Sequence, residues 1–224
     1  LDALAGTSDY TVSAWVCAAI DITTTWYLMT KYDNAYNGWL LSITATNQLR
    51  LETGDGGGLD VTLSAVNAYP TTVGSLNHVA VTGGGGGKAK LYINGSLLGS
   101  LVTDDDHNTI VANNDPLTIG IYRGGSTNTY PVTGIMNEIS IFTSELSLAQ
   151  IQELFNDGVP FDLEGSSLTG STTLVSYWRN AGLGEWEDLH STNTNKGTPT
   201  NAADTILLPE GTTAGKDILG FPLT

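Results

Sequence analysis

Apolar residues recur at every second position along much of the chain, which is the period of β-strands that bury one face. Turn-forming residues separate these runs. Asn94-Gly95 is the strongest hairpin signal, because both residues accept the positive φ that a type I′ turn needs. The strands that we expect from this pattern cover residues 10–20, 26–43 (a pair around a turn), 48–53, 59–63, 77–82, 89–93, 135–142 and 174–178. The pattern predicts an all-β protein.

Two of these runs also predict which side chains share a face. The run at 10–20 is apolar on both faces and therefore belongs inside a stack of two sheets. Its faces hold Tyr10, Val12, Ala14 and Val16 on one side, and Trp15 and Cys17 on the other. Strict alternation in the run at 135–142 places Ile135, Asn137, Ile139 and Ile141 on one face, and Met136, Glu138, Ser140 and Phe142 on the other.

One short amphipathic helix follows the strands. Ser147 is a good N-cap, and Gln150 three residues later completes a capping box. Gly158 and Pro160 are expected to stop the helix. The apolar residues at helical spacing are Leu148, Ile151, Leu154 and Phe155. A lone amphipathic helix after many strands suggests a plug on the side or end of a sheet sandwich.

Composition narrows the function classes. The 224 residues, 40% of them hydrophobic, fit one large sandwich with or without an appendage, and no apolar run approaches the length of a membrane span. The net charge of -15, with eight Lys plus Arg, argues against nucleic acid as a partner. Cys17 is the only cysteine, so an intrachain disulfide is excluded. This favours a bacterial origin or a phage assembled in the cytosol.

Three stretches in order resemble laminin-G-like, concanavalin A-like lectin/glucanase domains. They are SDYTVSAWV at 8–16, HVAVTGGGGGKAKLYINGSLLGS at 78–100, and the series L-x-I-G, G-x-x-N-E-I-S-I-F and E-L-S-x-x-Q-I-x-x-L-F-N-x-G at 117–158. The resemblance implies a jelly-roll sandwich of two antiparallel sheets with one short helix, spanning residues 1–161. Lectins, glycosidases, adhesion modules and virion parts all use this fold.

Residues 162–224 form a separate segment. A Gly/Ser/Thr-rich linker leads to the strand at 174–178, and the remainder is loop-like with short apolar islands. The series YWRNAG, W-E-D-L and N-K-G-T at 177–198 resembles the opening strands that usually precede such a sandwich. Either the chain is a fragment whose tail begins the next module, or the tail is a strand-and-loop extension packed on the same or a neighbouring sandwich. We favour the second interpretation, because it covers an open sheet edge.

The resemblance also identifies where catalytic acids would lie if the chain were a glucanase. Glucanases of this fold carry E-x-D-x-E on one strand face, whereas the matching stretch here begins with Glu138 and has Ser140 and Phe142 in place of the other two acids. The three histidines lack metal-ligand spacing. We therefore expect a protein that is not an enzyme, and a glycosidase with an unrecognised site is the weakest hypothesis.

Two functions remain. The first is a structural protein in the virion of a tailed phage, as a head decoration, fibre or tail-associated sandwich. Its partners would be other virion proteins or copies of itself, with host-surface glycans as a further candidate. The alternative is a secreted or cell-surface carbohydrate-binding module, which would be extracellular. Neither function involves nucleic acid or membrane insertion.

Candidate ligand-binding residues follow from the lectin alternative. An Asp or Asn beside an aromatic platform commonly binds sugar hydroxyls. The candidates are Asp33, Asn34, Tyr36, Trp39, Arg123 and Tyr130. For the aromatic residues between 26 and 39, core or rim packing is the competing interpretation. Calcium is the candidate cofactor, with Asp104, Asp105 and Asp106 as metal-ligand candidates, although an exposed acidic turn also explains these three.

Overall fold

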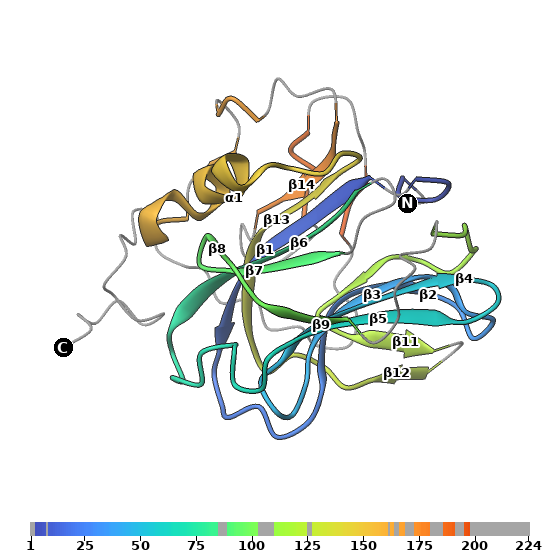
Figure 1. The fold of residues 1–224 in the computed structure, drawn as a ribbon, viewed down its shortest axis with the longest axis horizontal. Coiled ribbons are helices and arrows are strands. Elements are labelled where there is room, and N and C mark those ends of the chain that lie inside the picture. Colours follow the sequence, from blue (N-terminus) through green and yellow to red (C-terminus); the bar gives the residue numbers. More distant parts are fainter. Residues whose placement is uncertain are drawn as a thin grey trace.

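A computed structural model of the protein describes residues 3–7, 9–84, 89–102, 110–124, 127–160, 162–163, 166–168, 173–179, 186–190 and 195–197. Two antiparallel six-stranded sheets form a sandwich, as the sequence predicts (Figure 1). Sheet A has the strand order β14-β13-β1-β6-β7-β8, and sheet B the order β10-β2-β3-β4-β5-β9. The strands β11 and β12 form a separate two-stranded sheet, which we call the ribbon. Within the described residues, no helix has the length and apolar character needed to cross a membrane.

The bounds of the strands longer than three residues agree with the predicted strands to within a few residues. Sheet A consists of β1 (Tyr10–Ala18), β6 (Leu76–Gly83), β7 (Lys90–Ile93), β8 (Ser96–Leu97), β13 (Gly134–Phe142) and β14 (Leu174–Trp178). Sheet B consists of β2 (Trp26–Tyr32), β3 (Asn37–Ile43), β4 (Leu49–Asp55), β5 (Leu59–Ser64), β9 (Ser100–Val102) and β10 (Thr118–Ile119). The ribbon is β11 (Tyr122–Gly124) and β12 (Thr127–Thr129), and the helix is α1 (Leu148–Phe155), followed by the 3-10 turn Asn156–Gly158.

The core lies between the two sheets, and a second apolar cluster lies under α1. The four residues that the alternation places on one face of β1, Tyr10, Val12, Ala14 and Val16, all lie in this core. Asn94 and Gly95 both have positive φ and join β7 to β8, which confirms the predicted hairpin. Figure 1 shows α1 on the outside of sheet A and the β11-β12 ribbon on the outside of sheet B.

The predicted capping box of α1 is present. The Ser147 side chain accepts a hydrogen bond from the Gln150 backbone, and the Gln150 side chain accepts one from the Ser147 backbone. The helix ends at Phe155, earlier than Gly158 and Pro160 suggest, because Asn156 takes the left-handed conformation and its backbone N–H bonds to the Gln152 carbonyl.

The strict alternation predicted for β13 is wrong. Met136, Ile139 and Ile141 share the core between the sheets, so the inward face changes phase within the strand. The cause is a β-bulge, seen as a register shift against β1 between Ser13 and Trp15. Glu138 lies in the bulge with φ 46, a backbone conformation that few residues other than Gly adopt.

The described part of the C-terminal extension lies against sheet A. Strand β14 pairs with β13, so it covers that edge of the sheet. Trp178 donates from Nε1 to the Asn195 carbonyl at 2.6 Å, and Trp186 bridges to Gly197. The division of the chain at residue 161 stays a prediction.

Candidate functional site

A group of tyrosines covers the outer face of sheet B where the ribbon lies over it. In β2, Trp26 lies opposite Ile43 and faces the core, so the next residue, Tyr27, points outward. The centroid of its ring is 4.7 Å from that of Tyr122 and 6.0 Å from that of Tyr130. Such distances are those of interacting aromatic pairs.

Strand β4 adds two charged side chains to these rings. Arg50 and Glu52 alternate with core residues and therefore also point outward. The Arg50 guanidinium lies 5.8 Å from the centroid of the Tyr27 ring and forms an ion pair of 3.1 Å with Glu52. We call Tyr27, Tyr122, Tyr130, Arg50 and Glu52 the tyrosine face. Its members come from β2, β4, β11 and the residue that follows β12, which only the fold brings together.

Burial sets the protonation of this surface. Burial raises the pKa of the Glu52 carboxyl, and the nearby Arg50 opposes that rise. Burial also raises the pKa of Tyr122, with further contributions from Tyr27, Glu52 and Tyr130. The adjoining Tyr32 has its pKa raised to about 12, first by burial and then by Tyr122 and other acidic neighbours. The phenols of Tyr32 and Tyr122 therefore stay neutral at physiological pH and can both donate and accept hydrogen bonds.

Chemically, the tyrosine face combines ring surface with hydrogen-bonding groups. The Tyr130 side chain is 53% exposed, so its ring is open to a ligand. Arg50 and Glu52 remain 21% and 12% exposed, enough to be reached from solvent. The arrangement suits binding of a flat, polar molecule.

The sequence-predicted residues at the β2–β3 turn lie close together. Asp33 accepts hydrogen bonds from the backbone N–H of Ala35 at 2.8 Å and of Asn37 at 3.0 Å, and from the Asn37 side chain at 2.9 Å. Burial tends to raise the pKa of Asp33, but these hydrogen bonds lower it overall. Asp33 thus builds the turn, while Asn34 and Tyr36 are exposed at its tip.

The other predicted residues are divided between core and surface. Trp39 is only 3% exposed and belongs to the core, because it is in phase with the inward residues of β3, so it cannot offer a platform at the surface. Arg123 lies in β11 beside Tyr122, and Tyr130 belongs to the tyrosine face. The metal-ligand candidates Asp104, Asp105 and Asp106 lie outside the described residues.

Sequence reasoning missed four members of the tyrosine face, namely Tyr27, Arg50, Glu52 and Tyr122. Arg50 and Glu52 had a signal, because they are the polar phase of a strand whose other residues, Leu49 and Leu51, are apolar. Tyr122 had none, since the ribbon that carries it is short and irregular in sequence. Among the residues that the structure describes, no three His, Cys, Asp or Glu side chains are grouped to hold a metal.

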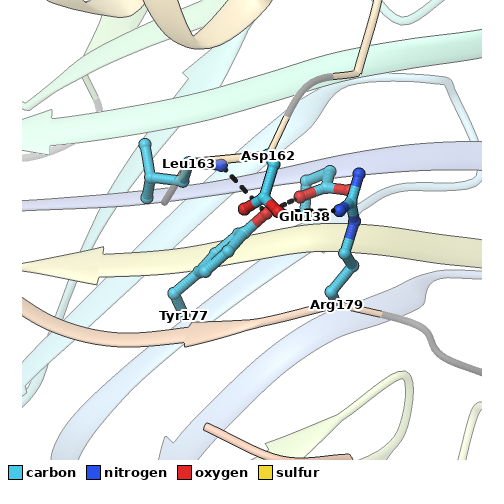
Figure 2. A network of polar contacts seen from close by, with 5 residues as sticks. All are labelled: Glu138, Asp162, Leu163, Tyr177 and Arg179. Atoms are coloured by element: carbon cyan, nitrogen blue, oxygen red, sulfur yellow. Dashed lines mark hydrogen bonds and ion pairs between the residues drawn. The ribbon is translucent and has the colours of Figure 1, made fainter. Parts of the chain in front are cut away.

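Glu138, the acid that matches a glucanase motif, lies on the other side of the sandwich in a polar network (Figure 2). The Tyr177 hydroxyl donates to Glu138 Oε2, and Arg179 Nε donates to Oε1 at 2.8 Å. Arg179 also bonds Asp162 at 3.1 Å, and the Leu163 N–H donates to the Tyr177 hydroxyl at 3.2 Å. The network ties β13 and β14 to the segment after α1.

The environment of Glu138 is that of a structural residue. Its side chain is 6% exposed. Burial raises its pKa, while the bonds from Tyr177 and Arg179 oppose the rise. Beside it is a cavity of about 10 Å³, lined also by Ser13, His78 and Ser140, which has room for about one water molecule and not for a sugar.

Sequence comparison assigns the chain to a family. Residues 2–152 match the profile of the concanavalin A-like lectin/glucanases superfamily. No protein with a curated description matches the chain in sequence.

Solved structures with a similar fold are distant in sequence. A protein from Bacteroides ovatus ATCC 8483, whose proposed role is carbohydrate binding, is 18% identical with a TM-score of 0.59, over 88% of this chain and 56% of that one. A heptameric SAP-like pentraxin from Limulus polyphemus is 18% identical with a TM-score of 0.51, over 66% and 70%. The binding domain of botulinum neurotoxin serotype D is 20% identical with a TM-score of 0.51, over 66% and 37%.

The chain thus spans little more than half of the Bacteroides protein and about a third of the toxin domain. At such identities these likenesses concern the fold alone. The match to the family profile covers most of the sandwich, from the first strand into α1. This chain belongs to the concanavalin A-like lectin/glucanases superfamily.

Proposed function

We propose that the protein is a non-catalytic carbohydrate-binding module and that its ligand lies on the tyrosine face. One observation carries the proposal: on an outer sheet face, Tyr27 contacts the rings of Tyr122 and Tyr130 and lies beside the paired Arg50 and Glu52. The carbohydrate-binding role proposed for the similar Bacteroides ovatus protein supports it. A module of this kind acts outside the cell or at its surface.

The chemistry of a sugar fits these side chains. The C–H face of a pyranose ring stacks on an exposed tyrosine such as Tyr130, which is apolar on its face and polar at its tip. Arg50 donates to a hydroxyl oxygen of the sugar, and Glu52 accepts from a hydroxyl hydrogen. Because Arg50 and Glu52 also hold each other, they are already oriented before the ligand arrives. Asn34 and Arg123 are proposed as further contacts at the margin.

The absence of catalysis is part of the proposal. Glu138 is buried under α1 and bonded to Tyr177 and Arg179, which leaves its carboxylate without access to a substrate. A glycosidase also needs a second carboxyl group placed across the scissile bond. Incubation with polysaccharides is expected to release no reducing sugar above the level of a heat-inactivated sample.

A glycan array followed by calorimetry on the bound glycans tests the proposal. Tyr130→Ala is expected to weaken binding by between about fivefold and about 150-fold, which corresponds to the value of about 1–3 kcal/mol that stacking on one aromatic ring contributes. The control is Leu148→Ala, which removes an equally exposed apolar side chain from α1, on the other side of the sandwich. An array without any bound glycan, or equal losses for the two variants, would overturn the proposal.

A structural role in a tailed-phage virion is the second candidate. Cys17 is the only cysteine of the chain and is fully buried in β1, so the sandwich folds without an intrachain disulfide. It therefore needs no oxidising compartment and can assemble in the cytosol, as phage particles do. The partners would be virion proteins or copies of this chain. Light scattering of the purified protein tests this candidate, since a lattice component should form large assemblies of its own copies. A species of small, fixed size that also binds glycans on the array favours the carbohydrate-binding module.

A further inference from the structure

Lys31 has an unusual place for a lysine. It lies in β2 opposite the core residue Trp39, so its side chain points between the sheets, and only 3% of the residue is exposed. Burying an ammonium group is costly unless its hydrogen bonds are replaced. Here Nζ donates to the carbonyl oxygen of Asn113 at 2.7 Å, to Oδ1 of the same residue at 2.9 Å, and to the carbonyl oxygen of Asp115 at 2.5 Å.

The side-chain amide of Asn113 also connects the loop of residues 113–115 to β2 and β3. Its Nδ2 donates to the Lys31 carbonyl oxygen at 3.1 Å and to the Asn37 carbonyl oxygen at 2.9 Å, while Oδ1 accepts from the Asp115 N–H at 3.0 Å. Gly38 leaves the space for this contact, because a Cβ there would clash with the Lys31 carbonyl and Asn113 Nδ2. Lys31 and Asn113 therefore form a clamp between β2–β3 and residues 113–115, which we call the lysine clamp.

The clamped segment leads directly to the tyrosine face. Three residues after Asp115, β10 pairs with β2, and the hydroxyls of Thr118 and Thr30 lie 2.5 Å apart. The Gly120 N–H then donates to the Leu28 carbonyl at 2.8 Å. The next strand, β11, brings Tyr122 onto the ring of Tyr27. The lysine clamp thus fixes the start of the segment 113–122, and the end of this segment carries the ring of Tyr122.

We propose that Lys31 is a positioning residue for the tyrosine face, acting through residues 113–120 without touching the ligand. The inference rests on the proposed function. The Lys31 ammonium binds three oxygen atoms of residues 113–115, as a bound cation would. It therefore holds this loop in one conformation. Loss of the ammonium leaves those oxygens buried without this donor, and residues 113–122 gain freedom. Tyr122 and Tyr130 then have to be ordered when a ligand binds, and this loss of entropy weakens the affinity.

Lys31→Met tests the proposal, because methionine keeps an unbranched side chain but cannot donate hydrogen bonds. Hydrogen exchange of the free protein should accelerate by about tenfold or more at the amides of 113–122, with sheet A little changed. On the printed glycan array, signals on the glycans that the wild type binds should fall about tenfold. The control is Val79→Ala, which truncates a fully buried side chain in β6 of sheet A. It lowers global stability and leaves residues 113–122 unchanged.

The outcomes separate the two ideas. Exchange at 113–122 that matches the Val79→Ala pattern, or array signals reduced no more than in that control, overturns the positioning role. An array on which the wild type binds nothing overturns the proposed function, while the exchange data still decide on the clamp. If Lys31→Met does not fold, Asn113→Ala removes the reciprocal side of the clamp and should give the same localised exchange.

Discussion

The buried histidine of sheet A makes a quantitative prediction about stability and pH. His78 is 1% exposed, with Nε2 2.7 Å from the Ser13 hydroxyl and its ring centroid 5.4 Å from that of Trp15. Burial lowers its pKa from 6.5 to about 3. Glu138 lines the same small cavity, but its carboxylate is already bonded to Tyr177 and Arg179. The folded protein therefore keeps His78 neutral where the unfolded chain protonates it.

The difference in His78 protonation between the folded and the unfolded chain sets the sign and size of the pH effect on the unfolding free energy. Since the folded pKa is depressed, the contribution of His78 is fully present above the unfolded value of 6.5 and is lost as the pH falls toward the folded value. A pH of about 4.5 lies about two units below the unfolded pKa of 6.5, so protonation stabilises the unfolded chain. Each unit is worth about 1.4 kcal/mol, so about 3 kcal/mol of unfolding free energy is lost relative to neutral pH. A folded pKa one unit higher changes this number little, because it still lies below that pH.

The assay is urea unfolding followed by tryptophan fluorescence at neutral pH and at about pH 4.5, for the wild type and His78→Gln. The loss of unfolding free energy between the two pH values should be about 2 to 3 kcal/mol smaller in the variant. His190→Gln, in a half-buried loop, is the matched control. A variant that loses as much stability on acidification as the wild type would refute the placement of His78 beneath α1.

Three further predictions concern the polar network, the helix cap and metal dependence. Tyr177→Phe should lower the unfolding free energy by about 2 kcal/mol, because it leaves a Glu138 oxygen and the Leu163 N–H without their partner; an unchanged urea midpoint would contradict the network. Ser147→Ala should cost about 1 kcal/mol by removing the capping box, whereas Ser147→Asp, which can also cap, should cost little. EDTA should leave glycan affinity measured by calorimetry unchanged, since Glu52 is already paired with Arg50; lost binding would point to carboxylates outside the described residues.

Much of the fold could be predicted because its signals are local. Alternation located the strands of both sheets that are longer than three residues, Asn94-Gly95 located a hairpin, and Ser147 with Gln150 located the start of the helix. The phase of β13 could not be predicted. The bulge at Glu138 depends on how β13 pairs with β1, and one extra residue reverses the face of every residue beyond it.

The candidate site was less predictable for the same reason. Tyr130 could be singled out from its loop, and the phase of β3 could have placed Trp39 in the core. The grouping of Tyr27, Arg50 and Tyr122, in contrast, depends on the register of β2 against β4 through β3 and on the course of the ribbon. These are contacts between residues far apart in sequence, and no pattern within one strand encodes them.

The proposed location of the ligand can be measured directly by NMR titration of the isotope-labelled protein with a glycan bound on the array. With the ligand at this location, the largest amide shifts should fall in β2, β4 and the β11–β12 ribbon, and Tyr130→Ala should lose them. Shifts centred on α1 and sheet A, or on the cavity beside Glu138, would contradict it.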